Sequence, residues 1–469
     1  MANAENMDIE SSENTDIPSE DARYRLPDDQ IKEIVEATRS QDSDTVHAAL
    51  DDLSVADSAE LLSKIKYEDR QELLSMYSDA LNPIIFTEID PELSRSYLSD
   101  IPAARVAQMI SELESDDALL LIEPLEPDFQ QEIIRKLSAK TRLALEEGLN
   151  FPEDSAGRLM RRELVSIPEF WTVGKTLDYL RTAADNLPED FFDIFIIDPA
   201  HHLTGEIPLS RIVRAKRTEK LKDLTLDETH PISAETDQED VARMFRRENI
   251  VSAPVVDDSE RLIGVITIDD IVDVIDEEAQ EDLLKLAGVD SGDLYRAVMS
   301  TTSTRFRWLF INLLTAILAS IVISFFDATI EQIVALAVLM PIVASMGGNA
   351  GTQALTVAVR AIATNEITGT NTMRVIWKET LVGIVNGFLF AVIIGFMAAF
   401  WFKTPVLGVV IALAMIINMV VAGLFGAGIP LLLQRFGSDP AVSSTVLLTT
   451  ITDVIGFLAF LGLATLFMI

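Results

Sequence analysis

Apolar and polar positions follow three different patterns along this chain, and the first is a series of short helical stretches. Between residues 28 and about 150, apolar residues recur with helical spacing in segments such as 55–65, 67–77 and 115–125, separated by turns with Asp, Pro or Ser. A short amphipathic helix cannot bury its own apolar face, so repeated units of this kind predict a superhelix of stacked helices. Residues 1–27 have low hydrophobicity and no basic, apolar leader, which predicts a disordered tail and no cleaved signal peptide.

The second pattern, between residues 151 and 275, alternates apolar β-type runs with helical stretches. Its clearest part is RLIGVITIDDIVDVI at 261–275, in which an apolar run leads to an Asp at the entry of a helix. The stretch LTGEIPLSRIV at 203–213 has the same layout, about 60 residues earlier. Two copies of one layout predict a tandem α/β repeat.

These two copies resemble CBS modules, small domains that pair with each other and bind adenine nucleotides or ions. The second copy keeps the family's GVITIDD pattern, whereas the first has diverged and has Pro208 and Ser210 in place. The resemblance makes ATP a candidate ligand of the pair. The divergence of the first copy leaves nucleotide binding open.

The third pattern begins with an acidic helical stretch and continues into long apolar segments. Residues 269–303 predict one connecting helix whose first half, DDIVDVIDEEAQEDLLKLAGV, is acidic. Five later segments are each long and apolar enough to cross a bilayer, which takes about 20 residues per helix. These expected spans are 308–326, 332–360, 380–401, 406–433 and 441–468.

Basic residues between the spans predict the orientation of the chain. Arg305 and Arg307 precede the first span, Arg374 lies between the second and third, and Arg435 lies between the fourth and fifth. Loops on the cytoplasmic side are rich in Lys and Arg. We therefore expect a five-helix transmembrane domain over 304–469 in the cell inner membrane, with the N-terminus cytoplasmic and the C-terminus outside.

The negative charge of the chain is concentrated in its first 300 residues. The formal net charge is −37, yet only six acidic residues follow position 300, against seven basic ones. Such a polyanionic region repels nucleic acid and gathers cations, which argues against a nucleic-acid partner. The chain has no cysteine, which excludes disulfides, thiolate metal sites and cysteine nucleophiles. It also has no ATPase P-loop, which argues against a primary pump.

The second expected span is polar where lipid would disfavour polar groups. The uncharged stretch 332–359 would extend about 42 Å as a helix, more than a bilayer core requires. Gly348 and Asn349 lie within it, in the sequence MGGNAGTQ. Small residues alone would indicate close helix packing, but Asn and Gln within the same seven residues fit a water-lined wall better. We therefore expect Gly348 and Asn349 to line or gate an ion path.

The last expected span carries a carboxylate, Asp453, between a third and half of the way along it. A charge at that depth costs about 2.5–3.5 kcal/mol and usually marks an ion path; the alternative is a protonated, packed carboxyl. Thr445 and Thr449 precede Asp453 by eight and four residues, which gives an oxygen-lined stripe on one face of the helix. Oxygen ligands without Cys or His suit a hard cation such as Mg²⁺ or Ca²⁺. Two chains would set two Asp453 side chains around one axis.

Three motifs, in order, resemble the MgtE family of bacterial magnesium channels or transporters. They are FPEDSAGRLM at 151–160, PIVASMGGNAGTQ at 341–353 and DPAVSSTVLLTTITDVIGF at 439–457. The order of helical domain, CBS pair, connector and five spans agrees with the family as well. The resemblance implies a homodimer with the pore on its two-fold axis, in which Asp453 binds the ion. It also implies that the connector is a plug helix that closes the pore when cytoplasmic Mg²⁺ is high.

The same resemblance implies that acidic residues of the cytosolic region bind regulatory Mg²⁺. Like charges on two domains repel, and divalent ions between them draw the domains together. The alternative is a solvated acidic surface. The candidates are Asp116 or Asp117 in the helical domain, Asp237 and Glu239 in the second CBS copy, and Asp270, Asp273, Glu278, Glu281 and Asp282 on the connector.

The sequence thus predicts a multidomain chain: an α-helical superhelical N domain (28–150), a tandem CBS pair (151–275), a plug helix and five membrane helices. The expected function is a dimeric Mg²⁺-selective channel without enzymatic activity, and its partners are Mg²⁺, the bilayer and a second copy. A CBS-regulated carrier or efflux protein for Mg²⁺, Co²⁺ or other divalent cations is the alternative. Asp453 is the only acid within the expected spans, which offers little for coupling to a counter-ion and favours a channel. A membrane-anchored sensor that conducts nothing would need neither Asp453 nor the polar second span.

Overall fold

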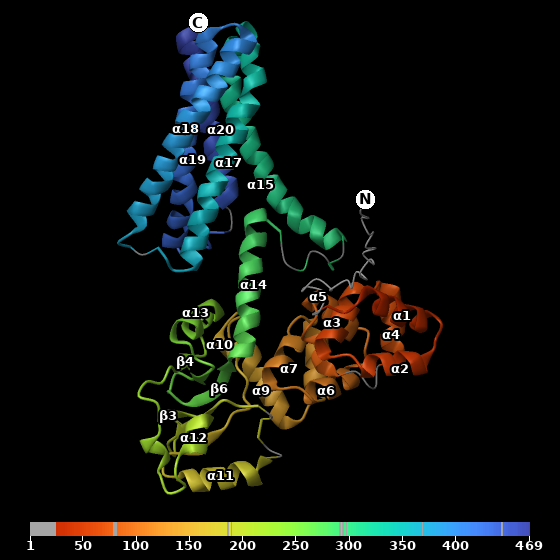
Figure 1. Cartoon of the computed structure of the whole chain (residues 1–469). Helices are drawn as coiled ribbons and strands as arrows, with labels where there is room; N and C mark the ends of the chain where they lie inside the picture. Colours follow the sequence, from red (N-terminus) through yellow and green to blue (C-terminus); the bar gives the residue numbers. More distant parts are fainter. Residues whose placement is uncertain are drawn as a thin grey trace, which may run out of the picture. The chain divides into compact units, whose positions relative to one another are not determined.

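The computed structural model describes residues 25–77, 82–184, 187–188, 190–289, 292, 295–296, 298–367, 369–441 and 444–469. The chain divides into two compact units, Met1–Ile275 and Asp276–Ile469, both drawn in Figure 1. Residues 1–24 of the predicted tail lie outside the described residues. Leu26, near the end of that tail, is buried in the first unit, and its backbone N–H donates to Glu60.

Short helices follow one another through the first part of unit 1, as the sequence predicts. Polar residues favour the helix starts: the side chains of Asp42, Ser54 and Ser138 each accept a hydrogen bond from a backbone N–H in the first turn of the following helix. The helices are α1 (Asp28–Arg39), α2 (Ser43–Asp51), α3 (Val55–Lys64), α4 (Tyr67–Tyr77), η2 (Pro83–Phe86), α5 (Pro91–Leu98), α6 (Ala103–Ser111), α7 (Ser115–Ile122), α8 (Pro127–Ile134) and α9 (Ala139–Leu149).

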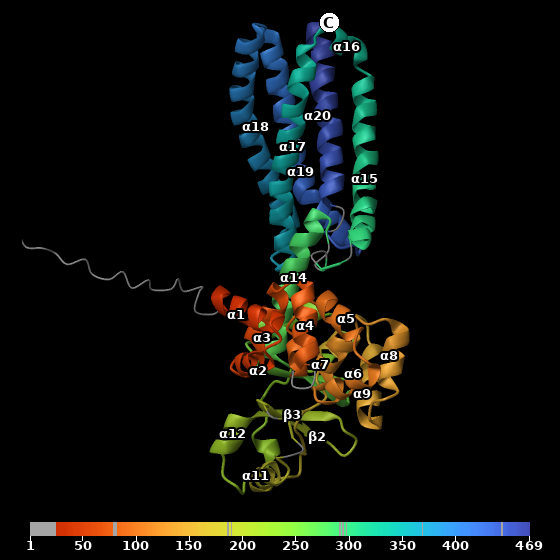
Figure 2. The same ribbon diagram turned by 90° about the vertical axis from the view of Figure 1, so that its right-hand side faces the viewer.

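One apolar core runs through all of these helices, whose arrangement is drawn in Figure 2. Val46 in α2, Leu61 in α3, Leu98 in α5, Ile110 in α6 and Ile122 in α7 are all fully buried in it. Because each helix contributes a few side chains to a shared core, none of them is stable alone. The predicted stacking of amphipathic helices is confirmed.

Two three-stranded sheets with the same topology form the rest of unit 1. In each, the first strand pairs parallel with the second and the second pairs antiparallel with the third, and a bulge interrupts the second pairing at Ile196/Ile197 and again at Val255/Val256. The tandem α/β repeat is therefore confirmed. Its elements are α10 (Ala156–Leu159), β1 (Ser166–Pro168), α11 (Val173–Thr182), β2 (Asp193–Ile197), β3 (Leu203–Pro208), α12 (Leu209–Arg214) and η4 (Leu221–Asp223), then β4 (Ile232–Ser233), α13 (Gln238–Glu248), β5 (Ser252–Val256) and β6 (Leu262–Thr267).

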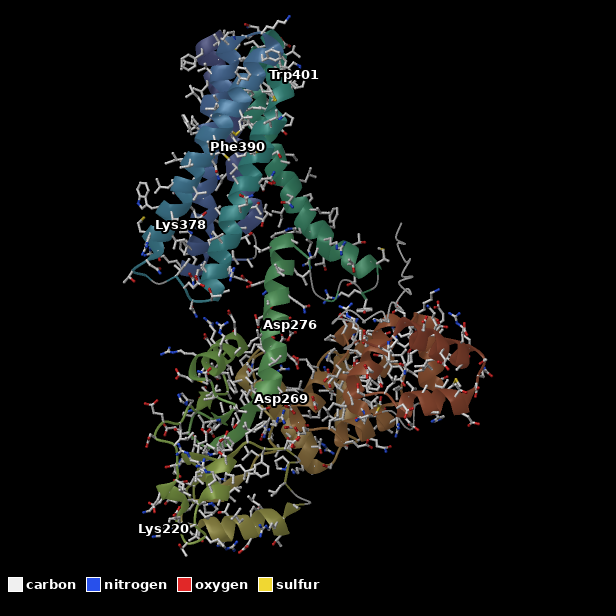
Figure 3. The ribbon with its side chains drawn as sticks, viewed as in Figure 1. Lys220, Asp269, Asp276, Lys378, Phe390 and Trp401 are labelled. Atoms are coloured by element: carbon white, nitrogen blue, oxygen red, sulfur yellow. The ribbon has the colours of Figure 1, made fainter. Side chains whose placement is uncertain are left out.

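The connecting helix α14 (Ile268–Ala287) is shorter than predicted. Gly288 follows it in the left-handed region, with φ +70°, which is a common way to end a helix. The Trp308 indole packs so closely that a Cβ on Gly288 would lie 2.0 Å from its Nε1. The prediction of one helix through Ser303 is therefore wrong, and a separate helix begins at Val298. Figure 3 labels Asp269 and Asp276, which lie in the first and third turns of α14.

Five helices of unit 2 are long and apolar enough to cross a membrane, as the sequence predicts. In Figure 2 they run alongside one another. The first and third begin earlier than expected, ten residues before 308 and eight before 380. The helices are α15 (Val298–Ser324), α17 (Ala335–Ala363), α18 (Thr372–Phe402), α19 (Pro405–Arg435) and α20 (Ser444–Met468), with the short α16 (Asp327–Gln332) after α15.

A buried amide fixes the position of α20 in the membrane unit. Asn418, in the middle of α19, is fully buried, and its Nδ2 donates to the carbonyl oxygen of Val343 in α17 at 2.8 Å. Gly347 of α17 and Gly456 of α20 pack directly on this amide; a Cβ on either would lie within 2.8 Å of it. Small residues permit such close approach between membrane helices. Since Gly456 is three residues from Asp453, this contact sets where the Asp453 carboxylate lies.

Candidate ion-binding site

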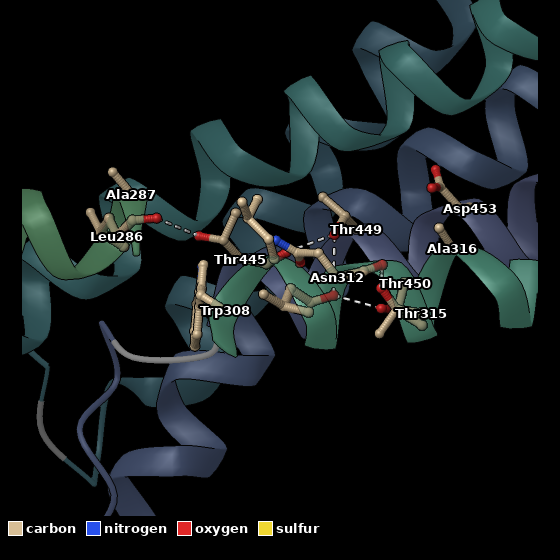
Figure 4. A pocket seen from close by; sticks show the side chains of 12 residues that line it. Leu286, Ala287, Trp308, Asn312, Thr315, Ala316, Thr445, Thr449, Thr450 and Asp453 are labelled. Atoms are coloured by element: carbon tan, nitrogen blue, oxygen red, sulfur yellow. Dashed lines mark hydrogen bonds between the residues drawn. The ribbon is translucent and has the colours of Figure 1, made fainter. Parts of the chain in front are cut away.

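A cavity of about 450 Å³ in unit 2 has Asp453 in its wall (Figure 4). It lies between α20 and α15, with the last residues of α14 at one side. Asp453 is the one carboxylate among the lining residues. The structure brings Asp453, Thr449 and Thr445 to one cavity, as their spacing predicts. The polar or aromatic lining residues are Thr445, Thr449, Thr450 and Asp453 from α20 and Trp308, Asn312 and Thr315 from α15, and Leu286 and Ala287 line it from α14.

The threonine hydroxyls of the cavity present lone pairs, because their protons are used within the protein. Thr449 Oγ1 donates to the carbonyl oxygen of Thr445 at 3.0 Å, and Thr450 Oγ1 donates to that of Val446 at 2.6 Å. A hydroxyl has one proton and two lone pairs, so each oxygen remains able to accept. Together with Asp453 they form an oxygen-lined wall of the kind that hard cations and their water shells prefer.

Two polar residues of α15 complete this wall, and the sequence analysis missed both. Asn312 and Thr315 line the cavity opposite α20, and Thr315 Oγ1 donates to the Asn312 carbonyl oxygen at 2.8 Å. Their spacing of three residues in an otherwise apolar span was the available signal, since residues at i and i+3 share one face of a helix.

Gly348 and Asn349 are not among the residues that line this cavity. Asn349 is exposed on α17, and its Nδ2 donates to Ser345 Oγ at 3.4 Å. Thr352 and Thr356 continue the same exposed stripe at helical spacing. A Cβ on Gly348 would meet nothing within 4 Å. One chain therefore exposes a stripe of polar side chains on a helix of membrane-crossing length.

α18 contains an acid that the sequence analysis places just outside the third span. Because α18 begins at Thr372, Glu379 lies two turns inside it and is 8% exposed. The neighbouring Lys378 ammonium, labelled in Figure 3, lies 3.8 Å from its Oε1. Asp453 is thus not the only acid within the five long helices.

The last turn of α14 contacts α20 and the segment before it, at the cavity. Thr445 Oγ1 donates to the Leu286 carbonyl oxygen at 3.2 Å. The Lys285 ammonium lies 2.6 Å from Glu281 Oε1 and 3.1 Å from Asp439 Oδ2. Of the two predicted sensing residues in the preceding turn, Glu281 therefore already has a basic partner, and Asp282 lies near Asp439. The sequence analysis did not consider Lys285 or Asp439.

In unit 1, a single arginine lies among acidic residues from two parts of the chain. Arg161 has a side chain only 13% exposed, and its guanidinium reaches Glu114 at 2.9 Å and Asp116 at 3.3 Å in the helical domain. It also reaches Asp269 at 3.3 Å and Asp270 at 3.2 Å in the first turn of α14. The predicted sensing residues Asp116 and Asp270 are thus brought together, but around a guanidinium.

One arginine does not neutralise this cluster. Burial and then the neighbouring Asp270 raise the pKa of Asp117 to about 6. The same two causes, in the same order, raise the pKa of Asp116 well above its usual range. Oδ1 of Asp116 is buried without a hydrogen-bond partner. The cluster therefore has an excess of negative charge that a proton or a further cation would relieve.

Acidification is expected to stabilise unit 1. A carboxyl whose pKa is raised by folding binds its proton in the folded chain first, so the free energy of unfolding should rise as the pH falls from 7 towards 5. Thermal unfolding of the full chain across this range checks the sign, and Asp117→Asn should reduce the slope. A wild-type Tm that falls steadily over the same range would contradict it. The charged groups that face Asp117 are Asp270, Arg161, Glu88 and Asp269.

The remaining predicted sensing residues occupy other positions. Asp237 caps α13 by accepting from the Glu239 N–H at 2.9 Å, and Glu239 pairs with Arg243 at 3.5 Å. Asp273 lies near Glu88, which is partly buried, and both burial and Asp273 raise the pKa of Glu88. Within the described part of the chain, no group of three or more His, Asp or Glu residues is arranged to hold a metal ion.

Three family models match the chain. The model described as a divalent cation transporter matches residues 340–463, which include Gly348, Asn349 and Asp453. The MgtE intracellular N domain model matches 53–154, and the CBS domain model matches 221–277. The CBS match thus covers the second copy, which the sequence analysis identifies as the better preserved one.

Curated relatives match over most of the chain. The magnesium transporter MgtE of Thermus thermophilus is 32% identical over 438 residues, which cover 92% of this chain and 97% of the relative. The protein of the same name from Enterococcus faecalis is 33% identical over 69% of this chain and 71% of its own length. Among solved structures, the cytosolic domain of the Mg²⁺ channel MgtE in complex with ATP is 28% identical, covers 52% of this chain and 99% of that one, and has a TM-score of 0.49.

Proposed function

The chain belongs to the MgtE family of divalent cation transporters, and we propose that it is a Mg²⁺-selective channel that its own α14 closes when intracellular Mg²⁺ is high. As a family member it is a membrane protein with CBS and N domains, and Mg²⁺ is its transported substrate. Arg305 and Arg307 near the start of α15, Arg360 near the end of α17 and Arg374 near the start of α18 support an inner-membrane orientation with the N-terminus in the cytoplasm.

The observation that carries the proposal is the Asp453 cavity. A carboxylate in a membrane helix is costly unless it serves a polar path. Here it lies beside two threonine hydroxyls of α20, Thr445 and Thr449, and two polar side chains of α15. Mg²⁺ gives up its water reluctantly, so one carboxylate with acceptors for the remaining waters suits it better than a dry cage of protein ligands.

A homodimer would account for the exposed polar stripe of α17. Ser345, Asn349 and Thr352 are exposed on a helix of membrane-crossing length, where lipid would leave the remaining hydrogen-bonding capacity of these side chains unsatisfied. Pairing of two copies through this region would enclose the stripe as a water-lined wall, and would place a second Asp453 on the same axis. Gly348, which leaves open space beside the stripe, would widen that wall.

Regulation is proposed to act through the acidic residues near and on α14. The predicted sensing residues Asp116, Asp117 and Asp270 form a cluster with excess negative charge, and Asp282 has a pKa raised by burial and by Asp439. Divalent ions that bind more tightly when α14 is docked would shift the population towards the closed state. Asp237 and Glu239 at the start of α13 are weaker candidates, because helix capping and Arg243 already satisfy them.

The second candidate function is an ion-coupled carrier or efflux protein for Mg²⁺, Co²⁺ or another divalent cation. The observation in its favour is Glu379, a buried acid in α18 that could carry a coupling proton. A carrier needs such a group, whereas a channel does not.

Flux through the purified protein in liposomes separates these functions. A channel should pass Mg²⁺ in proportion to a K⁺ diffusion potential, without any gradient of H⁺ or Na⁺, and Mg²⁺ on the cytoplasmic side should reduce the flux. Transport that requires an H⁺ or Na⁺ gradient and is lost in Glu379→Gln would favour the carrier. Empty liposomes and the Asp453→Asn variant are the controls, and no flux under either condition would reject both functions.

Neutralising the acids of α14 together is expected to weaken its response to Mg²⁺. Each bound ion shifts the equilibrium only by its differential affinity, so several sites acting together are needed for a sharp response. Mg²⁺ should protect α14 of the wild-type protein from proteolysis, and should protect it much less when four acids are replaced by Asn or Gln. Equal protection would mean that these carboxylates are only a solvated surface. The four are Asp273, Glu278, Glu281 and Asp282.

A further inference from the structure

The last turn of α14 is held at the Asp453 cavity by a hydrogen bond and by apolar packing. Its Leu286 carbonyl oxygen accepts from Thr445 Oγ1 at 3.2 Å, and its Leu286 side chain packs against the apolar cluster that includes Leu355 and Leu448. Leu286 and Ala287 both line the cavity (Figure 4). Docking of α14 is therefore partly apolar and partly a hydrogen bond from α20.

The ionic part of this contact comes from one lysine. The Lys285 ammonium bridges Glu281 Oε1 on its own helix and Asp439 Oδ2 in the segment that leads into α20, at 2.6 and 3.1 Å. Hydrogen bonds to these two carboxylates outweigh the effect of burial and raise the pKa of Lys285, so the ammonium is charged at neutral pH. It is a donor of three hydrogen bonds on a flexible stem, so it can satisfy two acids at once.

Lys285 also stands where a divalent cation would otherwise be needed. Glu281, Asp282 and Asp439 place three negative charges around it, and burial together with Asp439 raises the pKa of Asp282. Without the ammonium, Asp439 would repel both acids of α14, and docking of the helix end would weaken unless a cation replaced the lysine. With the ammonium present, a side chain of the protein itself neutralises part of this negative charge.

We propose that Lys285 is a tethered counter-cation that keeps α14 docked at the cavity in the absence of Mg²⁺ and thereby sets how strongly Mg²⁺ controls closure. The proposal rests on the proposed function, because it assumes that α14 is the gate. Lys285 acts through Asp439 and the position of Leu286, so it is a positioning residue. It makes the closed state partly independent of Mg²⁺. Mg²⁺ bound at Asp282 and its neighbours stabilises that state further.

Removal of the charge should loosen α14 most when Mg²⁺ is absent. Exposed ion pairs are worth little, and Lys285 is about one-third exposed, so the expected change in the docked population is about twofold to fivefold. In Lys285→Met, flux at zero cytoplasmic Mg²⁺ should rise by that factor, while millimolar Mg²⁺ should still close the channel. The ratio of flux without Mg²⁺ to flux with Mg²⁺ should therefore increase.

Docking can be measured without relying on conduction, because the chain has no cysteine of its own. A single Ala287→Cys reporter at the cavity edge should react with a charged maleimide slowly when α14 is docked and faster when it leaves. Adding Lys285→Met should speed labelling about twofold to fivefold without Mg²⁺ and have little effect with Mg²⁺. Asp439→Asn should speed labelling by a similar factor. The double variant Lys285→Met/Asp439→Asn should label little faster than either single variant, since both substitutions remove the same interaction.

The controls separate failure of this inference from failure of the proposed function. Lys285→Arg should behave like wild type, and Lys222→Met, at an exposed lysine of the CBS pair, should change neither labelling nor flux. If Mg²⁺ slows labelling of the reporter but Lys285→Met leaves the rates unchanged, the lysine is not a counter-cation, while the gating proposal stands. If Mg²⁺ affects neither labelling nor flux in the wild-type background, the proposed gating by α14 is itself wrong.

Discussion

Replacing Asp453 by alanine is expected to abolish Mg²⁺ flux through reconstituted protein while leaving the membrane unit folded. A hydrogen bond to a charged group contributes about 1.5–3 kcal/mol, so loss of this carboxylate should weaken ion binding by about tenfold to hundredfold in each chain. Two chains around one axis would lose two carboxylates together. The fold should tolerate the change, because Asp453 is only half-buried and borders a cavity rather than a packed core.

The isosteric variant Asp453→Asn distinguishes charge from shape. It preserves the volume of the side chain and should still lose nearly all flux, measured with a Mg²⁺-sensitive dye inside the liposomes. Thr452→Val is the matched control: Thr452 is next to Asp453 but fully buried, and its hydroxyl donates to the Leu448 carbonyl oxygen rather than lining the cavity. Undiminished flux in Asp453→Asn would remove this residue from the ion path.

Helical periodicity explains why this part of the site could be predicted from the sequence. Thr445, Thr449 and Asp453 are spaced by four residues on one helix, so they share a face wherever that helix packs. Asn312 and Thr315 belong to another helix. No pattern in the local sequence predicts that α15 packs against α20 at the level of Asp453. Their position depends on packing between helices, which a single sequence does not reveal.

The end of α14 shows a second limit of prediction from local pattern. The acidic helical stretch is continuous in its periodicity up to Ala287, but Gly288 adopts a positive φ and packs against Trp308, 20 residues later. A glycine in a helical pattern is tolerated often enough that it does not by itself mark an end. The early end places Lys285 and Leu286 in the final turn, where they contact Asp439 and Thr445.

The Arg161 cluster shows that local sequence also fails to predict which charged residues come together in the fold. The acidic residues Asp116, Asp117 and Asp270 could be identified as sensing candidates because they are dense and negative. The basic residue among them could not, because Arg161 comes 45 residues after Asp116 and 109 before Asp270. Its backbone pairs with Val265 of β6 in both directions, which holds it next to the start of α14. The structure therefore changes the hypothesis, from bare carboxylates that need Mg²⁺ to carboxylates that share one guanidinium.

Arg161→Met is consequently expected to destabilise unit 1 by about 3 kcal/mol, near the lower end of the range for breaking a buried ion pair. The guanidinium is largely buried and four carboxylates lose their partner, although Asp269 is 65% exposed and regains some solvation. Thermal unfolding of the full chain should show a clear fall in the Tm of the first transition. Methionine retains much of the apolar stem, so the loss reports the charge.

Mg²⁺ should restore more stability to Arg161→Met than to the wild-type protein, because a divalent ion can then take the place of the guanidinium among Glu114, Asp116 and Asp270. Arg162→Met is the matched neighbour: its guanidinium pairs with Glu147 at 2.5 Å, but that carboxylate is 47% exposed, so the expected loss is about 1 kcal/mol or less and should not depend on Mg²⁺. Arg161→Lys should recover part of the stability, since one ammonium reaches fewer of the four acids. If Arg161→Met and Arg162→Met lose the same stability, or if Mg²⁺ stabilises both variants equally, the cluster does not depend on Arg161 for its neutralisation.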